Sequence, residues 1–431
     1  MHRRCPQGRI EVWCASVVRA STGGMDTPAK TAEDLIGIVP HTLGYTPESS
    51  LVAILVVTDD DGVQSCGTTL RVDFDLETAA MTIAEGGEWL RDLVCRACEP
   101  SGVFLILYDE GYTPAGPERD WTDLDEDGTG DDYAQMHRGL VRAATDEMAT
   151  ALADGGITTL CAWWVSGGLF GRIDDSEDRG TDIGLAQSSA CATELVSTGS
   201  APAAGPDALV VKPADAAEAA AFRSAKHGGE LSHGGELSIA AAFDRLGELY
   251  PHLLELRGRE ETIDRERLRS LVTPDAVRVL DRLLAAKWSR DVLEMILSFD
   301  HPDFLPKRMC RFGPGELARH ARRCGTSRLA AEQMIGLSPR APRTRDLLLS
   351  IDLLEAYVRW ADPAVVPTAY GVIAWFHWTL GGSTMAEQYA LAALALEPDH
   401  AMAQLIISAV SQGYLPQWLM SKRTGARPLR H

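Results

Sequence analysis

The sequence has 431 residues, of which 45% are hydrophobic and 24% charged, and its formal net charge is −20 at pH 7. This composition is typical of globular proteins and excludes a wholly disordered chain, a collagen-like chain and a small disulfide scaffold. The acidic balance argues against a protein that coats nucleic acid with its whole surface. No apolar run approaches the roughly 18 to 20 residues of a membrane-spanning helix, so we expect no membrane partner.

Cysteine usage and the start of the chain bear on its location. The nine cysteines are odd in number and irregularly spaced, which indicates reduced thiols and predicts a cytoplasmic protein. Residues 1–24 carry no coherent pattern and are too polar for a secretory signal. We interpret them as a disordered extension or a mis-called start, with Met25 as the initiator.

Residues 25–195 predict an α/β domain, a three-layer structure with a mixed sheet. Leu51–Thr58 is a continuous β-branched run typical of a strand buried on both faces, and the turn residues 59–62 join it to a second strand as a hairpin. Alternation of further strands and helices favours right-handed crossovers. The remaining elements expected in this region are a strand at Ser65–Phe74, a helix at Thr78–Cys98, a strand at Gly102–Tyr108, a helix at Tyr133–Ala153 and a strand at Ile157–Val165.

Residues 196–213 are rich in Ser, Ala, Gly and Pro and predict a linker. Beyond this linker, residues 214–420 have helical periodicity almost throughout, which predicts an all-α domain.

An acidic segment precedes the helix at Tyr133–Ala153. Its alternating carboxylates and Gly128 resemble the first half of a calcium-binding loop, because such side chains converge on one point around a sharp turn. The bidentate Glu that completes an EF-hand loop is replaced by Ala134. The segment is therefore either a calcium site or a solvated acidic loop. The candidate ligands are Asp123, Asp125, Asp127 and Asp131.

Polar residues follow the predicted strands of the first domain. Asp59, Asp109 and Ser166 each come directly after a strand, and open α/β sheets bind ligands beyond the carboxyl ends of their strands. We expect these three residues to line one crevice, unless they are ordinary loop residues. The common nucleotide-binding, zinc-protease and hydrolase motifs are missing, so the sequence does not decide whether the protein is an enzyme.

Residues 307–345 carry ten Lys or Arg side chains against Glu316 and Glu332, a net charge of +8 within an acidic protein. The segment resembles a helix-turn-helix in outline, and its basic side chains, represented by Arg319, Arg322 and Arg323, could bind phosphates of nucleic acid. They could equally pair with acidic residues of the same chain.

Residues 367–400 resemble a tetratricopeptide unit, in which small residues lie where two antiparallel helices touch and a proline follows the second helix. Tyr370 and His377 fall on the first-helix pattern and are candidates for a groove that binds a partner protein. Single units of this kind do not form a solenoid alone. A packed helical pair is the alternative interpretation.

A wider resemblance covers most of residues 30–415. The segment from Asp34 to Val52, with Pro40, Gly44 and Pro47, and the Ala374–Trp378 segment resemble an uncharacterised actinobacterial family known as domain of unknown function number four-one-nine-two. The resemblance implies a host lineage and no activity.

Three functions remain open on this evidence. We favour a protein-interaction or scaffold module, because a tetratricopeptide-like pair is present and catalytic motifs are missing. The alternatives are a ligand-binding protein or enzyme that uses the sheet crevice, and a nucleic-acid-associated factor that uses residues 307–345.

Overall fold

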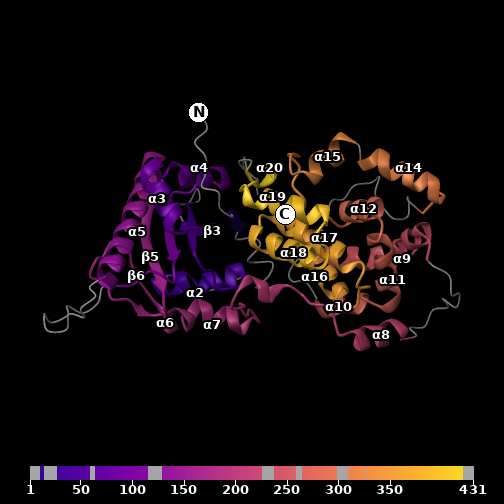
Figure 1. Ribbon diagram of the computed structural model, residues 1–431, viewed down its shortest axis with the longest axis horizontal. Coiled ribbons are helices and arrows are strands. Elements are labelled where there is room, and N and C mark those ends of the chain that lie inside the picture. The colour runs from indigo at the N-terminus through magenta and orange to yellow at the C-terminus, as the bar shows by residue number, and fades with distance from the viewer. Residues whose placement is uncertain are drawn as a thin grey trace. The chain divides into compact units, whose positions relative to one another are not determined.

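The computed structural model describes residues 10–13, 27–58, 64–114, 129–225, 237–258, 265–298, 308, 310–325 and 327–420. It divides into two compact units: the first is mainly the chain up to Pro206 and the second mainly residues 207–410. The first unit is built on a sheet and the second from helices (Figure 1), so the predicted order of an α/β part and an all-α part is confirmed. In these ranges, no helix has both the length and the apolar character needed to cross a membrane.

In the described chain, seven strands form one sheet in the order β1-β3-β2-β4-β5-β6-β7. β2 and β3 form the predicted antiparallel hairpin, and β4 pairs antiparallel with β2 but parallel with β5. The sheet is therefore mixed, as expected. The strands are β1 (Ile10–Trp13), β2 (Ser50–Thr58), β3 (Gln64–Asp73), β4 (Gly102–Tyr108), β5 (Thr158–Ser166), β6 (Leu169–Arg172) and β7 (Thr181–Asp182).

The sheet is the middle of three layers. Consecutive residues of β2, such as Val52, Ala53 and Leu55, are all buried, which requires cover on both faces because neighbouring side chains point to opposite sides. One packed group of helices comprises α3 (Leu76–Glu85), α4 (Glu88–Ala97) and α5 (Thr129–Asp154). A second comprises α2 (Ala32–Leu43), α6 (Ile183–Gln187) and α7 (Ala190–Ser197).

Two details differ from the sequence-based expectations. The helix expected at Thr78–Cys98 is two helices, because Gly86 ends α3 with φ of 93° and α4 begins after Gly87. Within residues 1–24, β1 pairs with β3 between Val72 and Thr69, so these four residues of the expected extension form a strand.

Local signals position the helices of the second unit. Thr273 caps α11 by accepting the amide hydrogen bond of Ala276, and Pro274 occupies the first turn, where a proline is tolerated. Gly381 ends α17 in the left-handed conformation.

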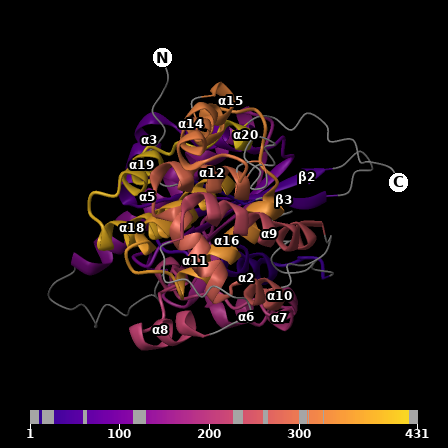
Figure 2. The same cartoon turned by 90° about the vertical axis from the view of Figure 1, so that its right-hand side faces the viewer.

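The helices that follow Pro206 are α8 (Ala216–Ser224), α9 (Ile239–Gly258), α10 (Arg265–Leu271), α11 (Pro274–Leu284), α12 (Lys287–Ser298), α14 (Pro314–Gly325), α15 (Arg328–Met334), α16 (Thr344–Val358), α17 (Val366–Leu380), α18 (Ser383–Leu396), α19 (Ala401–Ser411) and α20 (Gln417–Met420). α16 lies in the middle of this group and packs on α9, α10, α12 and α17 (Figure 2). α17 and α18 pack closely as consecutive helices, at the place where the sequence resembles a tetratricopeptide unit.

Candidate functional site

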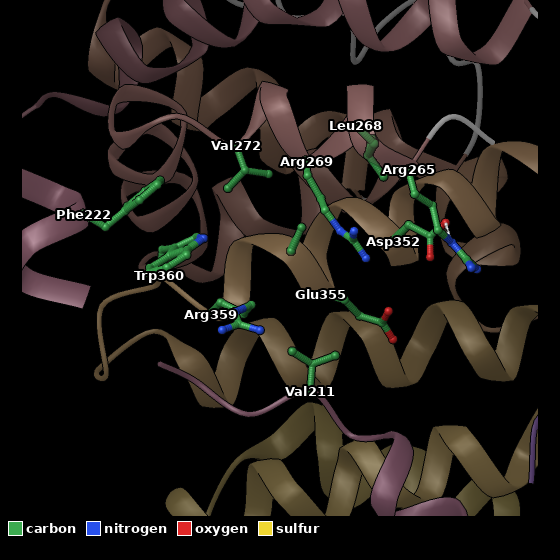
Figure 3. Close-up of a pocket in the computed structure, with 11 residues that line it drawn as sticks. Val211, Phe222, Arg265, Leu268, Arg269, Val272, Asp352, Glu355, Arg359 and Trp360 are labelled. Carbon is green, nitrogen blue, oxygen red and sulfur yellow. Dashed lines mark hydrogen bonds and ion pairs between the residues drawn. The ribbon is translucent and has the colours of Figure 1, made fainter. Parts of the chain in front are cut away.

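A cavity of about 820 Å³ lies in the helical unit between α8, α10 and α16, and we call it the α10–α16 cavity (Figure 3). This volume is in the range of small-molecule binding pockets. The cavity combines charged and apolar walls. Its lining residues are Val211, Phe222, Arg265, Leu268, Arg269, Val272, Asp352, Glu355, Ala356, Arg359 and Trp360.

Helical spacing places these side chains on facing stripes. The α10 wall runs from Arg265 to Val272 at intervals of three and four residues, and the α16 wall runs from Asp352 to Arg359 at the same intervals. Residues so spaced share one face of a helix, so each segment presents a stripe to the cavity. Leu268, on the α10 stripe, is buried and holds that helix against the unit.

The cavity has more positive than negative side chains. Arg265 forms an ion pair with Asp352, with 3.4 Å between Nε and Oδ2. The guanidinium groups of Arg269 and Arg359 make no hydrogen bond or ion pair with any residue the structure describes, although Arg359 lies 5.7 Å from the centre of the Trp360 ring. The cavity therefore presents two cationic groups whose hydrogen-bond donors are available to a ligand.

Glu355 is the second acidic residue of the lining, and a hydrogen bond from Tyr389 on α18 fixes its carboxyl group. The Tyr389 hydroxyl donates a hydrogen bond of 2.7 Å to Glu355 Oε1, while the Val211 amide donates to the same hydroxyl at 3.3 Å. Burial raises the pKa of Glu355 to about 7, and the hydrogen bond from Tyr389 opposes this shift. Near neutral pH, this carboxyl group therefore exchanges between its acid and carboxylate forms.

Tyr370 and His377, the candidate groove residues, lie behind this wall. Tyr370 is 4% exposed, and its hydroxyl donates a 2.7 Å hydrogen bond to the carbonyl oxygen of Val211. His377 stacks on Tyr389 with ring centres 5.6 Å apart. Burial lowers the pKa of His377 to about 4. Both residues thus support the segment around Val211 from the interior of the unit.

The carboxyl edge of the sheet holds a second group of polar residues. Asp109 follows β4, and its Oδ2 lies 2.6 Å from Nε2 of His137 on α5, a residue that is 2% exposed. The Asp109 amide donates to the carbonyl oxygen of Val165, next to the buried Ser166. Asp109 and Ser166 therefore lie at the same edge, as expected for the ends of parallel strands.

The expectation that the end of β2 shares this edge is wrong. Asp59 itself lies outside the described residues. Thr58, the last residue of β2, lies beside Ser101 at the start of β4, with 2.7 Å between the hydroxyl oxygens. β2 runs antiparallel to β4, so its carboxyl end is at the opposite edge from Asp109.

The acidic segment is mostly beyond the described ranges. Asp123, Asp125 and Asp127 lie outside them, as does the side chain of Asp131 at the start of α5, so calcium binding stays a prediction. Elsewhere, among the residues that are described, no three His, Cys, Asp or Glu side chains are arranged to hold a metal ion.

The basic segment contributes exposed side chains on α14. Arg319 and Arg323 line a surface hollow of about 600 Å³ together with Phe312 and Glu316. The side chain of Arg322 lies outside the described residues. Other basic residues of the segment form local pairs, such as Arg328 with Glu332 at 2.6 Å.

Sequence reasoning missed both His137 and the α10–α16 cavity. His137 is a single histidine inside a long helix, a signal too common to select. The cavity is assembled from residues up to 149 positions apart, between Val211 and Trp360. The sequence pattern that could have indicated the cavity is the matching spacing of charged residues at 265–272 and at 352–359, which places each set on one face of a helix.

Residues 33–417 match the family described as Domain of unknown function (DUF4192). The chain belongs to the DUF4192 family. No curated protein and no solved structure was found to match it. The match spans both units, so the sheet edge and the α10–α16 cavity both lie within the DUF4192 region.

Proposed function

We propose that this DUF4192 protein binds a small organic anion in the α10–α16 cavity. The observation that carries the proposal is the pair of guanidinium groups, Arg269 and Arg359, that line the cavity without a hydrogen bond or ion pair to a described carboxylate, although the charge of Arg269 acts on Asp352. Arg269 and Arg359 are solvent-exposed, and an anion bound between them and the apolar walls would partly remove both charges from water, which strengthens the attraction.

The apolar part of the lining supports an organic ligand over a bare inorganic anion. The rings of Trp360 and Phe222 stack with their centres 4.2 Å apart. Leu268 and Val272 are buried on the α10 side. Cavities of this kind bind the body of a ligand through apolar contacts and orient it through a few polar groups.

The proposal differs from the interaction module that the sequence favours. Tyr370 and His377 are engaged inside the helical unit, and Tyr389, to which both are packed, is fully buried. The same contacts support the cavity wall at Val211. Ligand binding therefore accounts for more of the observed geometry than a partner groove does.

Ligand-observed NMR with the full chain tests the proposal. A panel of small organic acids, amines and neutral compounds is screened against the wild type, the double variant Arg269→Ala/Arg359→Ala, and Arg340→Ala as a matched control. Arg340 is an exposed arginine that does not line the cavity. We expect at least one organic acid to bind the wild type and Arg340→Ala and to lose about tenfold or more in affinity in the double variant.

Ala356→Phe provides a steric test of the same site, because Ala356 lines the cavity on α16. The larger side chain should block the acids that bind the wild type. Absence of any binder that depends on Arg269 and Arg359 would overturn the proposal, as would equal binding by Ala356→Phe.

A further inference from the structure

Glu355 lines the same cavity as the two unpaired arginines (Figure 3). Arg269 approaches from α10, whereas Glu355 and Arg359 approach from α16 and the residue after it. A carboxylate in this place would repel an anion, and a carboxylic acid would donate a hydrogen bond to it. The protonation state of Glu355 therefore changes the charge and the hydrogen-bond donors that the cavity offers.

The contacts of Glu355 direct a proton to one of its oxygens. Oε1 accepts the hydrogen bond from Tyr389, whose own oxygen accepts from the Val211 amide. Oε2 makes no hydrogen bond with a described residue. The Tyr389 hydroxyl also lies 3.5 Å from the carbonyl oxygen of Leu209, but its 2.7 Å hydrogen bond to Oε1 is the shorter one. While Tyr389 donates to Oε1, an acid proton on Glu355 is carried by Oε2 and is available to a ligand in the cavity.

The charged and titratable groups around Glu355 belong to four helices and to the residue that follows one of them. Arg265 and Arg269 belong to α10, Asp352 to α16 itself, with Arg359 just after it, Tyr389 to α18, and His377 and Tyr370 to α17 behind Tyr389. No cation is within ion-pair distance of Glu355 among the described residues, and Arg265 is engaged by Asp352. Burial and the nearby Asp352 raise the pKa of Glu355, and the acid form is consequently well populated near neutral pH.

We infer that the ligand is an organic oxyanion whose acid group lies between Arg269 and Arg359 and accepts a hydrogen bond from the carboxylic acid form of Glu355. The inference rests on the proposed function, which it deepens by naming the ligand class and linking binding to the uptake of one proton. Bringing an anion to Glu355 favours its acid form, so binding strengthens as pH falls.

Fluorescence titration with 8-anilinonaphthalene-1-sulfonate tests this inference, because the sulfonate stays ionised over the range used. The full chain is titrated from pH 5.5 to 8.5 at constant ionic strength, in the wild type, Glu355→Gln, Arg269→Ala/Arg359→Ala and the control Arg340→Ala. For the wild type and the control, we expect Kd to be nearly constant at the acid end and to rise towards tenfold per pH unit above about pH 7.

Glu355→Gln keeps an oxygen for Tyr389 and a donor for the ligand, so its Kd should match the low-pH value of the wild type at every pH. Calorimetry of the wild type at pH 7.5 in Bis-Tris and in Tris, two amine buffers that contribute no oxyanion and differ in ionisation enthalpy, provides a measurement that needs no variant. Proton uptake on binding should make the two apparent enthalpies differ.

The possible outcomes separate the two proposals. Binding that depends on Arg269 and Arg359 but keeps its pH dependence in Glu355→Gln, or shows no proton uptake, would overturn the inference and leave the proposed function standing. Binding that is equal in the double arginine variant would overturn both. Tighter binding of 1-naphthylmethylammonium than of the sulfonate would also overturn both.

Discussion

Asp109 and His137 join the end of β4 to the third turn of the crossover helix through a 2.6 Å contact between Oδ2 and Nε2. The other oxygen of Asp109 accepts the amide hydrogen bond of Gly111 at 2.9 Å. His137 Nδ1 is buried and makes no hydrogen bond with a residue in the described ranges. The Asp109 carboxylate therefore binds both the buried imidazole ring of His137 and the backbone amide of the turn at Gly111.

Replacing Asp109 by Ala should lower the local stability of β4 and α5 by about 2 kcal/mol, because it leaves a buried imidazole nitrogen unpaired. Native-state hydrogen exchange measures the effect as about 30-fold faster opening of these segments, without requiring the two units to unfold together. Asp146→Ala, on an exposed position of the same helix, is the control and should change exchange little. Equal exchange in the two variants would show that the contact contributes nothing.

Two glycines of the first unit should respond oppositely to the same substitution. A Cβ on Gly87 would lie 2.5 Å from the Cα of Met148 and from the carbonyl oxygen of Glu147, so α4 and α5 would have to separate. Gly87→Ala should therefore destabilise this unit by about 1–3 kcal/mol.

Gly139 lies in the interior of α5, and a Cβ there would meet no atom within 4 Å. Gly139→Ala should stabilise the unit by about 0.5–1 kcal/mol, because alanine favours the helix. Hydrogen exchange of α5 in both variants measures the two effects, and shifts of the same sign would contradict the explanation.

Glu294 should make the helical unit less stable as pH rises from about 5 to 8. It is fully buried on α12, both of its carboxylate oxygens lack a hydrogen bond within the described chain, and burial raises its pKa to about 8. The unfolded chain loses this proton near the ordinary pKa of 4.5. The free energy of unfolding should therefore fall between about pH 5 and 8, by as much as about 1.4 kcal/mol per pH unit.

Glu294→Gln should remove that dependence. Urea denaturation should give the variant and the wild type similar stability near pH 5 and a more stable variant near pH 8. Glu266→Gln, at an exposed position, serves as the control. Parallel curves for wild type and Glu294→Gln would mean that the buried carboxyl group does not titrate with folding.

His377 should lower the stability of the helical unit as the pH falls. Its pKa is about 4 in the folded chain against an ordinary value of 6.5, so the unfolded chain binds the proton first as pH falls. Stability should thus decrease from about pH 6.5 to 4. His377→Phe retains an aromatic ring against Tyr389 and removes the titrating group, so it should flatten this limb of the curve in the same denaturation experiment. An unchanged slope would contradict the assignment.

Much of the architecture could be predicted because it follows from local patterns. The run at Leu51–Thr58 is apolar at every position up to its final threonine, and the turn after it indicated the hairpin correctly. The direction of β2 relative to β4 could not be predicted, since buried strands look alike whether their neighbours run parallel or antiparallel. Because of this ambiguity, the sequence alone predicts that Asp59 and Asp109 lie at the same edge of the sheet.

The candidate site was harder to predict than the fold. Asp109 could be selected because it directly follows a buried strand, but its partner His137 is 28 residues further along the chain. The role of Glu355 depends on Tyr389 and on burial, and neither the contact nor the loss of solvent is encoded in the local sequence. Tertiary packing, which brings α10, α16 and α18 together, creates the chemistry of this group.

The hydrogen bonds at Val211 have a practical consequence for subcloning the helical unit. This residue precedes α8, within a segment that reads as a linker, yet its amide and carbonyl group engage Tyr389 and Tyr370. An expression boundary placed at Ala216 would remove one wall of the cavity and leave the Tyr370 hydroxyl without its acceptor. A shortened protein intended for ligand screening should therefore begin at or before Asp207, so that the cavity is complete.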